Sequence, residues 1–102
     1  MAEAAAGPGK VSLLVPRALA ADLGGEREAV VDAPSLGTLA GLLDELRTAR
    51  PLLERRVRDE TGALRRFVNV YVDGTDVRHG DGLATPVRGG QAVEVIQSVA
   101  GG

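Results

Sequence analysis

The side chains in this sequence that could take part in acid–base chemistry are few and scattered. His79 is the single histidine and lies in the glycine-rich stretch VRHGDG, between Asp76 and Asp81. It could act as a general base beside one of these carboxylates, but general-base catalysis needs a partner at a defined spacing. No such spacing surrounds His79, so we interpret it as a solvated loop residue.

Metal and phosphate sites are not predicted in this chain. Asp73 and Asp76 supply too few oxygen ligands for a calcium-binding loop, and aspartates in turns usually stabilise the turn itself. The segment GPGK lacks the spacing of a phosphate-binding loop. The absence of cysteine excludes disulfides, thiolate catalysis and cysteine metal sites. We therefore expect no metal ligand, no bound cofactor and no catalytic activity in the domain itself.

The group with the most distinctive setting is the carboxylate of the last residue. The sequence ends in SVAGG, and its final residues Gly101 and Gly102 have no side chain. Extended, residues 98–102 would reach about 16 Å beyond the last strand. A backbone without Cβ atoms passes through a channel that would exclude side chains, and its amides can hydrogen-bond along a groove.

This carboxylate needs help to react. It is ionised and unreactive at neutral pH, so a second enzyme must activate it, most simply as an acyl-adenylate made from ATP. The ending then has the properties of an acyl donor on a protein handle. A frayed end with no role is the alternative, because two glycines can also end a chain by chance.

A second candidate feature is the charged run ERRVRDETGALRR, residues 54–66. It contains five arginines among the acids Glu54, Asp59 and Glu60. Two interpretations stay open: a solvated surface, or an electrostatic docking surface for an acidic partner. Arg65, Arg66 and the adjacent Phe67 are our candidate docking residues.

The elements that must position these residues begin with two strands and a helix. KVSLLVP (10–16) and EREAVVDA (26–33) read as strands, joined as a hairpin around Gly24 and Gly25. Leucines at 39, 42, 43 and 46 form the apolar face of a helix. We expect Thr38 to cap this helix, Leu36 to cover its first turn, and Pro51 to end it. A short helical turn and a loop then lead to Gly62.

The second half of the sequence predicts further strands. In RFVNVYVDG (66–74), Val68, Val70 and Val72 should face the core, while Phe67, Asn69 and Tyr71 face the other way. Asp73 and Gly74 form a turn, after which TDVR pairs back. Leu83 and Val87 are expected to fill the core from a loop. Gly89 and Gly90 turn the chain into a last strand, residues 91–96.

This order of elements predicts an α+β fold of the β-grasp (ubiquitin-like) type, with one main helix packed on one face of a mixed sheet. Residues 10–97 form the domain, residues 1–9 a disordered leader and residues 98–102 a flexible tail. Net charge −2 argues against a nucleic-acid partner, and no apolar stretch approaches the length of a membrane span. The leader lacks the pattern of a signal peptide, so we expect a cytoplasmic protein.

The predicted fold and the glycine ending together resemble the MoaD/ThiS family of ubiquitin-like sulfur carrier proteins. The resemblance covers Lys10 to Gly102 and is strongest to the CysO-type carriers of actinobacterial cysteine biosynthesis. It is carried by RFVNVYVDGTDVR (66–78), GLATPV (82–87) and SVAGG (98–102). The leader before Lys10 departs from the compact start that is usual in the family.

The resemblance implies a mechanism. An E1-like activating enzyme of the MoeB/ThiF type, using ATP and Mg, would adenylate Gly102, and a sulfur donor would convert it to a thiocarboxylate. Gly101, Ala100 and Val99 would thread the active site of the partner enzyme. A sulfur-accepting synthase, in CysO-type systems a pyridoxal-phosphate cysteine synthase, would take the sulfur, and a peptidase would later release the cysteine.

Other clients and roles stay open. The chain could be the small subunit of molybdopterin synthase or the thiazole sulfur carrier of thiamine synthesis. It could instead be a ubiquitin-like modifier whose Gly102 forms isopeptide bonds, or an interaction domain in which the glycines have no role. Lys10 is the single lysine of the sequence, which leaves few amines for an activated terminus to acylate.

Overall fold

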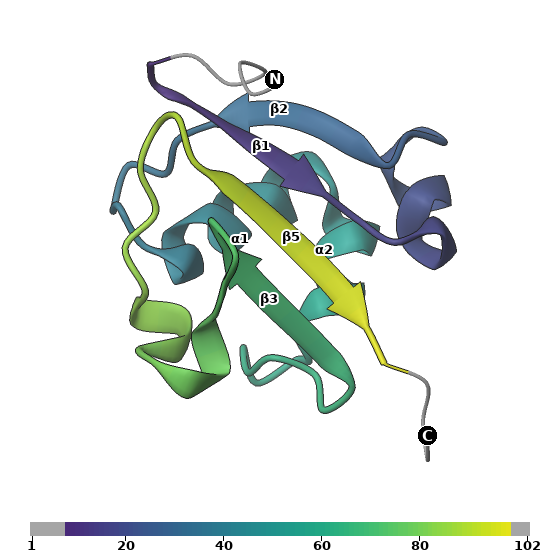
Figure 1. The fold of residues 1–102 in the computed structure, drawn as a ribbon. Helices are drawn as coiled ribbons and strands as arrows, with labels where there is room; N and C mark the ends of the chain where they lie inside the picture. Colours follow the sequence, from purple (N-terminus) through teal and green to yellow (C-terminus); the bar gives the residue numbers. More distant parts are fainter. Residues whose placement is uncertain (1–7, 99–102) are drawn as a thin grey trace.

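The computed structural model describes residues 8–98. Two strands and a 3-10 helix come first, two α-helices follow, and three strands with two short 3-10 helices complete the domain (Figure 1). In chain order the elements are β1 (Lys10–Leu14), η2 (Arg17–Leu23), β2 (Glu28–Asp32), α1 (Leu39–Ala49), α2 (Pro51–Val57), β3 (Val68–Val72), β4 (Thr75–Asp76), η3 (Val77–His79), η4 (Gly82–Ala84) and β5 (Ala92–Gln97).

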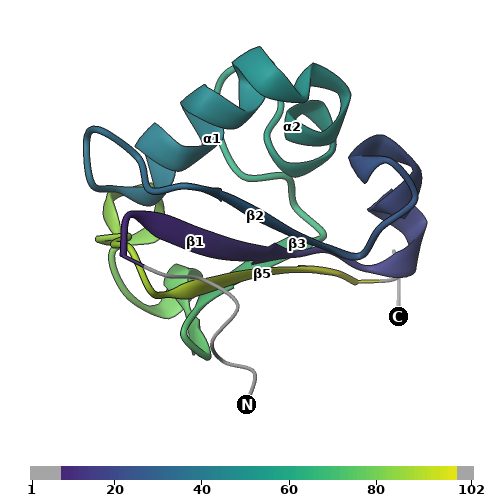
Figure 2. The ribbon, with the colours of Figure 1, turned by 90° about the horizontal axis from the view of Figure 1, so that it is seen from above.

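The strands form one mixed sheet in the order β2-β1-β5-β3-β4. β1 and β5 are parallel, whereas the pairs β1–β2, β3–β5 and β3–β4 are antiparallel. Both α-helices lie on the same face of the sheet (Figure 2). This arrangement confirms the predicted β-grasp fold, with α1 as its main helix.

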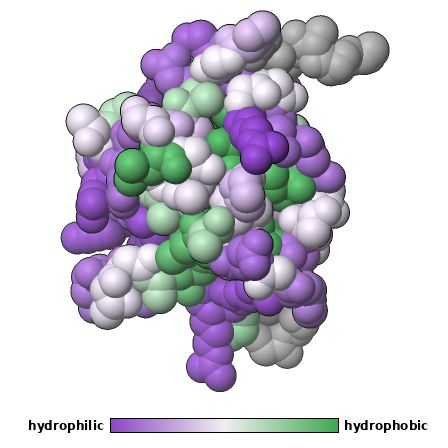
Figure 3. All heavy atoms as spheres, turned by 90° about the vertical axis from the view of Figure 1, so that its left-hand side faces the viewer, coloured by the Kyte–Doolittle hydropathy of each residue, from purple (hydrophilic) through white to green (hydrophobic). Residues whose placement is uncertain are grey.

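The core lies between the helices and the sheet. The four leucines of α1 that were predicted to face inward are all buried, as are Val68, Val70 and Val72 of β3. Val87 is buried and Leu83 packs against the core, as expected of the loop before β5. On the side at the left of Figure 1, hydrophobic groups lie among hydrophilic ones at the surface (Figure 3). Each fully buried leucine or valine contributes about 1.5–3 kcal/mol to folding.

The ends of α1 follow their sequence signals, with one exception. The Thr38 hydroxyl accepts a hydrogen bond from Gly41 N at 3.1 Å, and Pro51 both ends α1 and occupies the first position of α2. Leu36 lies over the first turn of α1 as predicted, since its Cβ is 3.1 Å from where a Cβ on Gly41 would be, but its side chain is 76% exposed and covers little of the turn. Leu36 lies in a turn closed by a hydrogen bond from Gly37 N to Pro34 O, and most of its side chain is exposed to solvent.

The connection between β1 and β2 differs from a simple hairpin. The two strands pair as predicted, and Gly24 and Gly25 adopt the positive φ angles of a turn, 68° and 90°. Between Pro16 and this turn, however, the chain forms the 3-10 helix η2, which buries Leu19 and Leu23. Seven residues are too few to show a helical period in sequence, so burial against the core decides this element.

The turn after β3 is formed as predicted. Asp73 and Gly74 both have positive φ, 48° and 85°, which suits the two-residue turn between antiparallel strands. β4 covers only Thr75 and Asp76, after which the chain enters η3. The returning segment is therefore shorter than the predicted TDVR.

Candidate functional site

The candidate site surrounds the point where the chain leaves the sheet. β5 pairs with both β1 and β3 and ends at Gln97, and the next residue, Ser98, donates its N–H to Phe67 O at 2.7 Å. This hydrogen bond holds the last described residue beside the start of β3 (Figure 1). The predicted site residues Val99, Ala100, Gly101 and Gly102 lie outside the described residues.

Exposed hydrophobic side chains accompany this exit. Phe67 is 42% exposed, and the Arg66 guanidinium lies 5.7 Å from the centre of its ring. Ile96 is also exposed and pairs with Asn69, so it shares the outer face of the sheet with Phe67. A cation over an exposed aromatic ring contributes about 0.5–1 kcal/mol, which is enough to favour one orientation of Phe67.

A basic groove lies on the other side of the exit. It has a volume of about 600 Å³ and extends from η2 and α2 to the end of β5. Three arginines, two acids, an exposed leucine and a glutamine line it: Arg55, Arg56, Arg65, Asp22, Glu60, Leu52 and Gln97. Arg65 Nε donates to Arg55 O at 2.6 Å, and Arg56 pairs with Asp22 at 3.1 Å. The lining carries a net positive charge next to the end of β5.

The structure thus brings the three candidate docking residues together. Arg65 lines the groove, while Arg66 and Phe67 flank the exit on the sheet side. Their main chain is held by Arg78, whose Nη2 donates to Arg65 O at 2.7 Å and whose Nη1 donates to Arg66 O at 3.2 Å. Sequence reasoning did not assign this positioning role to Arg78. Nothing in the sequence indicated this role beyond the presence of one arginine after the β3–β4 turn.

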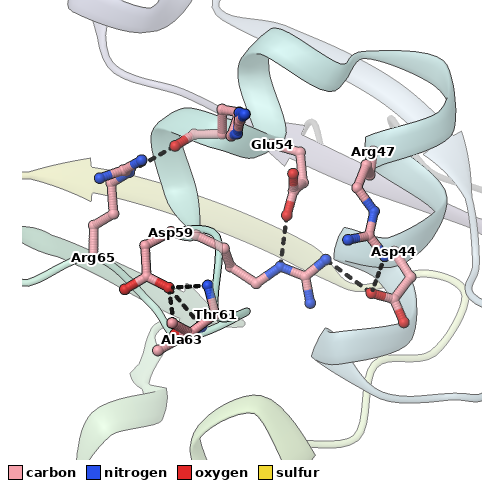
Figure 4. Close-up of polar contacts among 9 residues, drawn as sticks. Asp44, Arg47, Glu54, Asp59, Thr61, Ala63 and Arg65 are labelled. Carbon is pink, nitrogen blue, oxygen red and sulfur yellow. Dashed lines mark hydrogen bonds and ion pairs between the residues drawn. The ribbon is translucent and has the colours of Figure 1, made fainter.

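One arginine of the charged run has a different role. The Arg58 side chain is only 5% exposed; its Nε donates to Glu54 Oε2 and its Nη2 to Asp44 Oδ1, both at 2.8 Å (Figure 4). Glu54 is equally buried, and Asp44 also lies 3.5 Å from Arg47 on the surface. Arg58 therefore joins α2 to α1 and is neither a solvated nor a docking residue. Only its spacing of four from Glu54 hinted at this pairing.

The loop that leads to Arg65 is organised by Asp59. The Asp59 carboxylate accepts hydrogen bonds from the Thr61 hydroxyl at 2.6 Å and from the amides of Thr61 and Ala63 at 2.8 and 3.3 Å (Figure 4). These bonds, that of the Thr61 hydroxyl first, lower the pKa of Asp59 from its usual value. The loop then returns to α2, where Arg65 N bonds to Val57 O at 2.9 Å.

The side chains considered for catalysis lie apart from this exit. His79 is 84% exposed and its Nε2 is 3.7 Å from Asp76 Oδ2, while the other oxygen of Asp76 accepts from Arg78 N. These contacts agree with the interpretation of His79 as a surface residue. Within residues 8–98, no group of three or more His, Cys, Asp or Glu is placed to hold a metal ion. In that same range no helix is long and apolar enough to cross a bilayer.

Comparison with known proteins places the chain in a family. The ThiS family model matches residues 18–102. The sulfur carrier protein CysO of Mycobacterium tuberculosis is 33% identical over 94 residues, which cover 90% of this chain and 98% of that protein. That relative is a carrier protein, in agreement with the prediction that the chain is not itself an enzyme.

Solved structures agree. The crystal structure of M. tuberculosis CysO has a TM-score of 0.75 at 32% identity and covers 87% of this chain and 99% of its own. The BexX/CysO complex of Amycolatopsis orientalis gives 0.72 at 33% identity, covering 90% and 99%. Small archaeal modifier protein 1 of Haloferax volcanii gives 0.71 at 26% identity, covering 89% and 99%. This chain therefore belongs to the ThiS family and is similar over most of its length to the CysO sulfur carrier proteins.

Proposed function

We propose that this chain carries sulfur as a thiocarboxylate on Gly102. The observation that carries the proposal is the position of β5: this central strand ends at Gln97, between exposed Phe67 and a basic groove. Membership of the ThiS family supports the same role. Partner enzymes bind the folded domain and perform the chemistry on its terminal carboxylate.

The chemistry requires two steps on the terminal carboxylate. A carboxylate oxygen of Gly102 attacks the α-phosphate of ATP, which gives an acyl-adenylate and releases pyrophosphate. A sulfur nucleophile then attacks the acyl carbon and AMP leaves, so that one oxygen is replaced by sulfur. ATP and Mg²⁺ belong to the activating enzyme, where the metal would neutralise phosphate charge. The product is a softer and stronger nucleophile than the original carboxylate.

The surface around the exit is the proposed docking region for the E1-like activating enzyme. Phe67 offers an apolar anchor, while Arg65 and Arg66 offer charge to an acidic partner surface. Complementary charge raises the rate of encounter, and a central aromatic anchor supplies much of the affinity. Gly101, Ala100 and Val99 then follow as the segment that threads the partner's active site.

The sulfur acceptor that we propose is a cysteine synthase that uses pyridoxal phosphate. This choice rests on similarity to CysO of M. tuberculosis. CysO of A. orientalis was solved in complex with BexX, so an acceptor of another kind is the alternative. Molybdopterin synthase and the thiazole branch of thiamine synthesis are further alternatives, because the partner enzyme selects the client.

Intact-protein mass spectrometry tests the proposal. The chain is incubated with an E1-like enzyme from the same source, ATP, Mg²⁺ and sulfide. We expect a mass gain equal to the replacement of one oxygen by sulfur, which should require ATP and be absent when Gly102 is deleted. If the mass stays unchanged although the same activating enzyme modifies a carrier protein that it is known to act on, the carrier role is refuted.

A modifier role is the second candidate. It is favoured by similarity to small archaeal modifier protein 1 of H. volcanii. In that case Gly102 would form isopeptide bonds with lysines of target proteins. Digestion of source-cell extract followed by mass spectrometry would then show lysines bearing the C-terminal residues of this chain, and their absence would argue for the carrier role alone.

A further inference from the structure

Among residues 8–98, the long free edge of the sheet is β2. It is the outermost strand on one side of the sheet, at the top of Figure 1, whereas the opposite edge strand, β4, has two residues and continues directly into η3. Figure 2 views the molecule from the β2 side, with α1 above the strand. An unpaired edge offers main-chain N–H and C=O groups to another extended chain.

The hydrogen bonds of β2 show which of its main-chain N–H and C=O groups are not bonded to β1. Val15 N bonds to Arg27 O, and Ala33 N bonds to Gly9 O. Because such bonds alternate along an antiparallel pair, the odd-numbered residues of β2 face β1. The main-chain groups of Glu28, Val30 and Asp32 therefore point away from the sheet. Within residues 8–98, no backbone hydrogen bond joins β2 to a strand other than β1.

An apolar pocket lies directly beside this edge. It has a volume of about 140 Å³ and is formed between β2 and α1 by Val31, Leu42, Leu46 and Ala49, with Asp32 and Glu45 also in its lining. A chain that adds to β2 would alternate its side chains between two faces. Every second side chain would then lie over this pocket, which has room for an aliphatic group.

The other face of the edge is acidic. Glu28 and Asp32 lie on either side of Val30, and all three side chains are on the face turned away from α1. Lys10 Nζ bonds to Asp32 at 2.5 Å, but this is an exposed pair with little energetic weight. Glu45 adds a further negative charge on the α1 side. Arg27 lies beside Glu28 as a further cation. The three carboxylates still outnumber Lys10 and Arg27, so the edge has a net negative charge and attracts basic side chains.

The same charges argue against a second copy of this chain as the occupant. Antiparallel pairing of two β2 strands about Val30 would place Glu28 of each copy opposite Asp32 of the other. Like charges directly opposite each other destabilise a strand pair. Charge complementarity therefore favours a different protein segment with basic residues.

We propose that β2 and α1 form a docking groove for an extended protein segment in which aliphatic and basic residues alternate. The aliphatic side chains occupy the pocket between Val31 and Leu46, the basic ones lie over Glu28 and Asp32, and the main chain pairs with Val30. β1 separates β2 from β5 in the sheet, so such a partner leaves the end of β5 free. The groove would hold the chain on one partner while its terminus reacts with another.

The probe is a capped peptide of alternating valine and lysine, titrated into the ¹⁵N-labelled full chain. We expect shifts and slowed hydrogen exchange at the amides of Glu28, Val30 and Asp32, and binding that weakens with added salt. A peptide of alternating valine and glutamate is the charge control. A peptide methylated on alternate nitrogens tests the main-chain bonds without changing the protein.

Variants of the chain separate the three contributions. Val30→Pro removes the outward N–H and spares the bonds to β1, so it should weaken binding about fivefold or more, whereas Val30→Ala keeps the N–H. Glu28→Gln with Glu45→Gln should weaken binding about fivefold, and Glu60→Gln with Asp81→Asn should not. Ala49→Trp should fill the pocket and block binding.

Two results would overturn the proposal. One is the absence of shifts at β2 amides up to millimolar peptide, and the other is equal binding of the lysine and glutamate peptides. If Val30→Pro does not fold, undiminished binding of the methylated peptide refutes main-chain pairing. None of these measurements involves Gly102, so their outcome is independent of the carrier proposal.

Discussion

Replacing Arg58 by methionine should be among the most destabilising single changes on the helical face. The substitution keeps an unbranched chain of similar reach but leaves the Glu54 carboxylate, 5% exposed, without its partner 2.8 Å away. Removing one member of a buried ion pair costs about 3–5 kcal/mol. The total stability of a domain of this size is about 5–15 kcal/mol, so the loss is a large fraction of it.

The assay is urea unfolding followed by circular dichroism, with thermal unfolding as a second measure. We expect a fall of about 3–5 kcal/mol in the free energy of unfolding, and a decrease in Tm of at least about 12 °C. The matched control is Arg47→Met, because Arg47 contacts the same Asp44 at 3.5 Å from an exposed position. That variant should lose less than about 1 kcal/mol.

A double variant separates an unpaired charge from lost packing. In Glu54→Leu with Arg58→Met, no buried charge is left, so much of the stability should return. The reasoning is refuted if Arg58→Met costs no more than Arg47→Met. It is also refuted if the double variant is as unstable as Arg58→Met alone, since packing and not charge would then explain the loss.

Three further predictions concern the glycine turn before β5, the Asp59 loop and the docking region. Gly89→Ala should cost about 1–3 kcal/mol in urea unfolding, because a Cβ there would lie 2.4 Å from Gly9 N; Gly80→Ala, with its nearest neighbour at 4.0 Å, is the control that should cost much less. The lowered pKa of Asp59 means that its contribution to stability is fully present above pH 3.8 and is lost as the pH falls through the folded-state value, so Asp59→Asn should flatten the acid side of a stability–pH curve; an unchanged acid limb would contradict this. Arg65→Glu and Phe67→Ala should each slow ATP-dependent thiocarboxylate formation about tenfold or more while both chains stay folded by circular dichroism, and Arg47→Glu should not; equal rates for all three would place the docking surface elsewhere.

Local sequence signals predicted most of the fold. The spacing of Leu39, Leu42, Leu43 and Leu46 predicts a helix because only one face of α1 can reach the core. Alternation in β3 predicts which valines are buried, and Asp73 with Gly74 predicts the turn that follows, since each signal depends on neighbours within a few residues. Such signals are complete in the sequence, and the structure follows them closely.

The misses share a different cause. η2 forms because Leu19 and Leu23 pack against the core. A segment of seven residues is too short for its sequence pattern to predict this packing. Leu36 does lie against the first turn of α1, but most of its side chain stays exposed, which its position in the sequence did not show. In the sequence, Arg58 is one of five arginines in a charged run that is typical of a surface. In the structure it is buried between α1 and α2. Each outcome depends on contacts between segments that are distant along the chain.

The sequence by itself predicted the chemistry proposed for this protein, from its glycine ending, the absence of cysteine and a single lysine. These are properties of residue types, and folding does not change them. Only the tertiary structure decided where β5 ends and which residues surround its end. Pairing of β5 between β1 and β3 brings Ser98 to Phe67, and the packing of α2 and η2 sets Arg55, Arg56 and Arg65 beside it. Within residues 8–98 the strand order also leaves the outer edge of β2 without a strand partner. A sheet has an edge strand at each side, and sequence order does not show which strands these are.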